Sequence, residues 1–168
     1  MRGVLIAVAL CLTGCADVVA KGQPQTAATT VILVRHAERV LGDGDVPLTD
    51  RGRERAAALA RLLVDADVRS IITSEMIRTQ QTAAPLAKQA KLEPQIIPAA
   101  KLDAIVERIR AAKGGTVLVV HHSNTVPQLV EKLGAKTPPI RDDEFDRLIL
   151  LTLLATGTPS VVTLRYGN

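Results

Sequence analysis

Apolar residues run along the 168-residue chain in two alternating patterns. Short β-branched and aliphatic runs, such as Val31–Val34, are typical of strands buried on both faces. Longer segments between them carry apolar residues three or four positions apart, the spacing of an amphipathic helix. The predicted strands are 29–36, 68–74, 93–99, 116–122, 146–154 and 160–166. The predicted helices are 47–66, 76–90, 101–115 and 127–134.

Capping and helix-breaking residues define the predicted helix ends. Thr49 or Asp50 stands near the start of the first helix, and Pro127 suits the first position of the last one. Gly114 closes the third helix, and Pro85 predicts a kink in the second.

Alternating strands and helices predict an α/β fold. We expect a three-layer sandwich in which a central, mostly parallel sheet of about six strands has helices on both faces. A chain of this length suits one domain with a sizeable core, which we place at 29–168. In such sheets, ligands bind beyond the carboxyl ends of the strands.

The first residues have the layout of a secretory signal peptide. A positive start at Arg2 and a short apolar run precede Leu12-Thr13-Gly14-Cys15. This ending resembles the bacterial lipoprotein signal, which implies that Cys15 is lipidated and anchors the protein on the periplasmic side of the cell envelope. Ala16 in place of an aspartate implies the outer membrane if the source is Gram-negative. We assign 1–15 to the signal peptide and 16–28 to a flexible tether; an ordinary cleaved signal is the alternative.

Composition excludes several classes of function. With one Phe, one Tyr and no Trp, the chain lacks the aromatic platforms on which single-stranded nucleic acid stacks. Both cysteines, Cys11 and Cys15, lie in the leader, so the mature domain has no thiol chemistry. The net charge of +4 suits an anionic ligand, but scattered lysines and arginines are also typical of a solvated basic surface.

Polar residues end three of the predicted strands. Arg35 and His36 follow the first, Ser74 ends the second, and His121-His122 end the fourth. Because these ends meet at one edge of a parallel sheet, we expect the side chains to converge there. Neighbours on a strand point to opposite faces, so His121 and His122 are not expected to share one metal ion. We expect no metal and no organic cofactor.

Such a set of residues suits a tetrahedral dianion. An arginine fork matches phosphate oxygens, and a histidine can carry a covalent phosphoryl group. "VRHAER", "PLTDRG", "SEMIRTQQTA" and "VVHHSNTVP" resemble, in order, motifs of the histidine phosphatase superfamily, which has the phosphoglycerate mutase-like fold. The resemblance implies that His36 is the nucleophile and that Arg35, Arg78 and His122 complete a phosphate pocket. Ala37 and His121 stand where this family more often has glycine.

The sequence offers three candidates for the general acid. The resemblance places a carboxyl group in the region of Asp103, with Glu38 and Glu107 as rivals, and Asp103 also suits the first turn of a helix. Arg35 could instead form an ion pair with Glu38, while Arg55 has the pattern of a solvated helix residue.

The expected function is therefore a metal-independent phosphatase, lipid-anchored in the cell envelope. Its expected substrate is a phosphorylated small molecule or phosphoprotein. The alternative is a non-catalytic lipoprotein of the same fold that binds a phosphorylated or other anionic ligand.

Overall fold

We describe residues 28–167 in a computed structural model of the protein. The predicted signal peptide and the predicted tether, apart from Ala28, lie outside the described residues. Within residues 28–167, no helix is both long enough and apolar enough to span a bilayer.

Six strands form one sheet in the order β3-β2-β4-β1-β5-β6. The strands β1 to β4 run parallel, whereas β5 is antiparallel to β1 and β6 is antiparallel to β5. This confirms the predicted α/β fold with a mostly parallel sheet. The strands are β1 (Thr29–Arg35), β2 (Val68–Thr73), β3 (Gln95–Ile96), β4 (Gly115–His121), β5 (Arg147–Leu153) and β6 (Ser160–Arg165).

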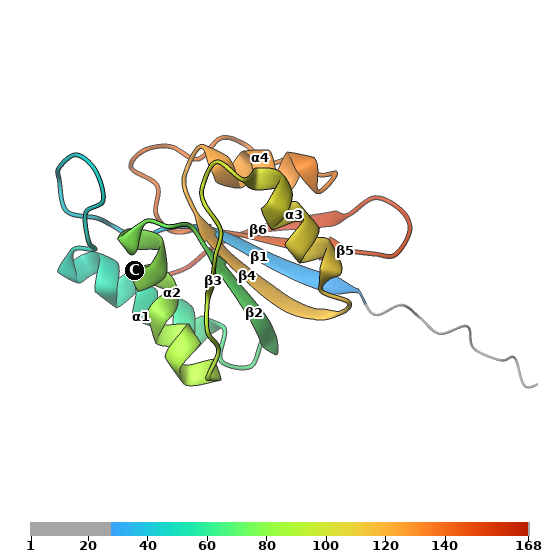
Figure 1. Cartoon of the computed structure of the whole chain (residues 1–168), viewed down its shortest axis with the longest axis horizontal. Helices are drawn as coiled ribbons and strands as arrows, with labels where there is room; N and C mark the ends of the chain where they lie inside the picture. Colours follow the sequence, from blue (N-terminus) through green and yellow to red (C-terminus); the bar gives the residue numbers. More distant parts are fainter. Residues whose placement is uncertain (1–27, 168) are drawn as a thin grey trace, which may run out of the picture.

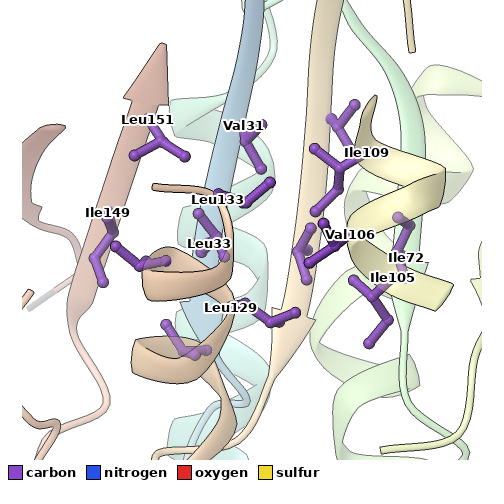
Figure 2. Packing of buried hydrophobic residues seen from close by; sticks show 14 of the residues in the cluster. Val31, Leu33, Ile72, Ile105, Val106, Ile109, Leu129, Leu133, Ile149 and Leu151 are labelled. Atoms are coloured by element: carbon purple, nitrogen blue, oxygen red, sulfur yellow. The ribbon is translucent and has the colours of Figure 1, made fainter. Parts of the chain in front are cut away.

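Helices cover both faces of the sheet, as Figure 1 shows. The helices are α1 (Asp50–Leu62), α2 (Ile77–Ala90), α3 (Leu102–Ala111) and α4 (Thr125–Lys132). Alternate side chains of β1 pack into two different apolar layers, one on each face of the sheet. Val31 and Leu33 pack toward α3 and α4 (Figure 2), whereas Ile32 and Val34 pack toward α1 and α2. Burial of aliphatic side chains on both faces therefore fixes the sheet that carries the polar strand ends.

The predicted start of α1 is confirmed, whereas that of α4 differs. Thr49 caps α1, because its hydroxyl accepts a hydrogen bond from Gly52 N at 3.1 Å. Prediction of Pro127 as the first residue of α4 is wrong: the helix begins at Thr125. Pro127 is tolerated there because a first-turn N–H needs no partner within the helix.

Gly52 lets α1 pack closely against the segment that follows β1. A Cβ atom at this position would lie 2.1 Å from the carbonyl oxygen of Glu38, a distance that no side chain tolerates. The "PLTDRG" motif therefore fixes α1 beside the residues that follow His36.

Candidate active site

The ends of three strands meet at one edge of the sheet. Arg35 and His121 are register partners at the ends of β1 and β4, and His36 N donates to the His121 carbonyl at 2.8 Å. The rings of His36 and His122 lie edge to face with their centroids 5.5 Å apart. Ser74, which follows β2, places its hydroxyl 3.0 Å from His122 Nε2. The structure thus brings together the polar strand ends that the sequence predicts to converge.

The hydrogen bond of the His36 ring fixes its tautomer. Its Nδ1 lies 2.8 Å from the Ala37 carbonyl, which can only accept a hydrogen bond, so Nδ1 carries the proton. The Ala37 N–H in turn donates to Thr82 Oγ1 at 2.9 Å and fixes this turn. Burial, followed by the charge of Arg35, lowers the pKa of His36 to about 3, although the bond to Ala37 opposes the shift. The ring is therefore neutral at pH 7, with a lone pair on Nε2.

Arg35 is anchored by one end of its guanidinium group. Nη1 donates to the carbonyls of Arg141, Asp142 and Glu144 at 2.9, 2.8 and 3.2 Å. Its guanidinium carbon lies 4.1 Å from the centre of the Phe145 ring. The buried Nε has no hydrogen-bond partner among residues 28–167. Burying a donor without an acceptor costs free energy. An anion bound beside Arg35 would accept this hydrogen bond and remove the cost.

Arg78, in the first turn of α2, has the same feature. Its Nε is also buried without an acceptor in the part of the chain that the structure describes. Its positive charge contributes to lowering the pKa values of both His36 and His122, which places it at the same cluster. Two arginines whose buried Nε donors lack an acceptor within residues 28–167, together with a neutral histidine, have the chemistry to bind a phosphoryl group.

Comparison with known proteins agrees with this geometry. Residues 31–101 match the model of the histidine phosphatase superfamily (branch 1), a stretch that includes Arg35, His36 and Arg78. The fold is similar to that of the protein histidine phosphatase SixA complexed with tungstate. That match has a TM-score of 0.69 at 20% identity and covers 81% of this chain and 96% of that one. The family match is thus confined to residues 31–101, while the structural match shows that the fold as a whole is shared with this phosphatase.

Two further proteins are similar to this chain, one in fold and one in part of its sequence. A mycobacterial glucosyl-3-phosphoglycerate phosphatase is similar with a TM-score of 0.66 at 14% identity, over 83% of this chain and all of that one (100%). The "Probable phosphoglycerate mutase GpmB" of Photorhabdus laumondii is 36% identical over 77 residues, which is 39% of this chain. The matched part spans only 36% of that relative's length.

The surroundings of His122 keep this ring neutral at pH 7. Burial is the main cause, and the charge of Arg78 adds to it, so the pKa of His122 falls to about 4. Ser74 Oγ, which is also hydrogen-bonded to Thr79 Oγ1 at 3.0 Å, holds Nε2 of this ring. His122 can therefore carry a proton for the phosphoryl group only if the anion itself raises its pKa.

This gives a prediction about pH. A phosphate dianion beside His122 favours the charged ring, so orthophosphate is expected to raise the His122 pKa from about 4 toward its ordinary value. An NMR titration of the ring signals with and without orthophosphate measures the shift. A His122 pKa that orthophosphate leaves unchanged would place this ring outside the anion site.

The prediction that His121 and His122 point to opposite faces of the sheet is wrong. The two rings contact each other, with their centroids 5.0 Å apart. The reason is that β4 ends at His121, so His122 lies beyond the strand and the alternation of faces no longer holds. His121 is fully buried, and its Nδ1 lies 2.5 Å from Thr125 Oγ1.

Asp103 is the one predicted site residue that the structure does not bring to the cluster. Its side chain is 84% exposed, and its carboxylate forms an ion pair with Lys132 Nζ at 2.7 Å. This ion pair connects α3 to α4. Its place in the first turn of α3 agrees with a favourable interaction with the helix dipole. The rival Glu107 lies exposed on the same helix.

Glu38 also has a structural partner. It does not pair with Arg35 but with Arg55, whose Nη2 lies 2.8 Å away, and with Arg51 at 3.1 Å. Burial would raise the pKa of Glu38, but the hydrogen bonds from Arg55 and the nearby charges outweigh it and lower the pKa. Glu38 therefore stays ionised and is a poor proton donor at neutral pH.

Sequence reasoning missed three residues around the site. Arg55 is buried rather than solvated. It lies on the same face of α1 as Gly52 and Leu59, and this helical spacing could have predicted its burial. The ring of Phe145, the only Phe in the chain, lies 6.1 Å from that of His36. The negative charge of Glu75 raises the pKa values of His121 and His122 and so opposes part of the lowering caused by burial. Its Oε2 accepts a hydrogen bond from Ala99 N at 2.7 Å.

Within residues 28–167, no group of three or more His, Cys, Asp or Glu side chains is arranged to hold a metal ion.

Proposed function

We propose that this protein is a metal-independent phosphatase that acts through a phosphohistidine intermediate on His36. The observation that carries the proposal is a neutral His36 ring together with buried Nε donors on Arg35 and Arg78 that have no acceptor among residues 28–167. Superfamily relatives with phosphatase and mutase activities support the general class.

The proposed reaction has two in-line displacements at phosphorus. In the first, His36 Nε2 forms a bond to phosphorus while the bond to the leaving oxygen or nitrogen breaks with its electron pair. In the second, water attacks the phosphohistidine, loses a proton to solvent and releases orthophosphate with return of the electron pair to Nε2. Arg35 and Arg78 stabilise the charge on the equatorial oxygens, and His122 joins them once it is protonated.

The surroundings of His36 favour substrates with good leaving groups. Glu38 is held ionised by Arg55, and Asp103 bonds to Lys132 at the surface. A leaving group that needs little proton donation, such as a phenolate or an imidazole, therefore suits the site better than an alkoxide.

A simple assay tests the function. Purified protein with EDTA present should release orthophosphate from an aryl phosphate, more slowly from an alkyl phosphate, and should be inhibited by vanadate. Activity that EDTA abolishes and a divalent metal restores would contradict the metal-free mechanism. Tight oxyanion binding without any turnover would instead favour the non-catalytic, anion-binding lipoprotein.

We also propose that the protein is lipid-anchored through Cys15 on the periplasmic side of the envelope. The support is the lipoprotein-type ending at Leu12-Thr13-Gly14-Cys15. Cys15→Ser is expected to leave the domain folded and to move it from the membrane pellet to the soluble fraction. A mutant that still sediments with the membrane would disprove the anchor.

A further inference from the structure

A projecting loop lies between β1 and α1 (Figure 1), and its base is closed by backbone pairing. Arg39 and Leu48 form an isolated antiparallel bridge, and Val40 N donates to the Pro47 carbonyl at 3.0 Å. We call residues 40–47 the β1–α1 loop. Gly42 and Gly44 have φ angles of +144° and +79° and allow its sharp reversal.

A few polar contacts hold the loop to the domain. Arg39 Nη1 donates to the Gly42 carbonyl at 2.8 Å, and Arg78 Nη1 lies 3.4 Å from the Gly44 carbonyl. The Leu41 residue is 99% exposed and contributes no apolar burial. Segments held by few exposed polar contacts open at low cost in free energy. The loop can therefore exchange its partners without unfolding the domain.

Asp45 makes the two contacts that connect the loop to the active site. Its Oδ1 accepts a hydrogen bond from Ile77 N at 2.8 Å, at the start of α2, where Met76 provides no side-chain cap. The same oxygen lies 3.7 Å from Arg78 Nη1, and the Asp45 side chain is 46% exposed. The ion pair is therefore long and partly solvated, which makes it weak.

Arg78 is thus shared between the phosphate cluster and an internal carboxylate. We propose that Asp45 competes with the substrate's phosphoryl group for Arg78. The carboxylate balances the arginine until a dianionic phosphoryl group, with shorter and paired hydrogen bonds, replaces it. Asp45 thereby selects fully ionised phosphoryl groups over weaker anions. This inference rests on the proposed function, because it requires the His36 cluster to bind phosphate.

The test compares Asp45→Asn with a matched control, Asp43→Asn, which removes the same charge from the same loop. An asparagine at position 45 can still accept the hydrogen bond from Ile77 N, so α2 stays capped. Orthophosphate binding is measured by calorimetry at low ionic strength. Loss of a partly exposed ion pair corresponds to about two- to fivefold tighter binding by Asp45→Asn. Asp43→Asn should bind like wild type, and high salt should narrow the difference.

The outcomes separate this role from its alternatives. If Asp45 instead holds Arg78 in the productive position, Asp45→Asn will bind orthophosphate more weakly than wild type, and the proposal is overturned. Equal affinities for the two variants would overturn it as well. Arg78→Ala should weaken binding at least about tenfold, as expected for a charge-assisted donor. A wild-type protein that binds no orthophosphate would refute the phosphate site itself, and the role of Asp45 with it.

Discussion

His36→Ala is expected to reduce phosphate release from an aryl phosphate to the background of the assay. The substitution removes the neutral imidazole whose Nδ1 is held by the Ala37 carbonyl and whose Nε2 is the proposed nucleophile. Without a nucleophile, the two-step route through a covalent intermediate is closed. The measurement is kcat for an aryl phosphate in the presence of EDTA.

Binding of orthophosphate provides the control for His36→Ala. Both arginines remain in this variant, so it should still bind the anion, which separates lost chemistry from a lost fold. Turnover within tenfold of wild type would mean that another group attacks phosphorus.

Arg55→Met is expected to lower the free energy of unfolding by about 3 kcal/mol, the lower end of the range for breaking a buried ion pair. The Arg55 and Glu38 side chains are only 5% and 13% exposed, and Arg55 also donates to the Tyr166 carbonyl at 2.8 Å. Without Arg55, the Glu38 carboxylate keeps only an exposed partner. Urea unfolding at neutral pH measures the change.

Arg51→Met is the matched control for the ion pair. Arg51 contacts the same Glu38 oxygen, but its side chain is 70% exposed. Its loss should cost less than about 1 kcal/mol, as for other solvent-exposed ion pairs. Equal losses for the two variants would show that burial does not set the strength of this pair.

Much of the fold follows from local sequence pattern. The run Val31–Val34 supplies both apolar layers, since alternate residues reach opposite faces of the sheet. The parallel order of the strands then places Arg35, Ser74 and His121 at the same edge. Only the alternation rule and the general behaviour of parallel sheets are needed for this part of the site.

The rest depends on contacts between distant parts of the chain. Arg35 is anchored by the Arg141 carbonyl, 106 positions away, and Arg55 reaches the carbonyl of Tyr166, 111 positions away. No local pattern reports such partners. The relation of His121 to His122 also depends on where β4 ends, and strand ends are the least predictable part of an element.

The most direct test of the proposed mechanism is to trap the covalent intermediate. A rapid alkaline quench during turnover, followed by mass spectrometry, should reveal one phosphoryl group on His36 that is stable in base and labile in acid. Because Nδ1 of His36 donates a hydrogen bond to the Ala37 carbonyl, phosphorus should be attached to Nε2. An adduct on another residue, or turnover with no adduct on His36, would contradict the mechanism.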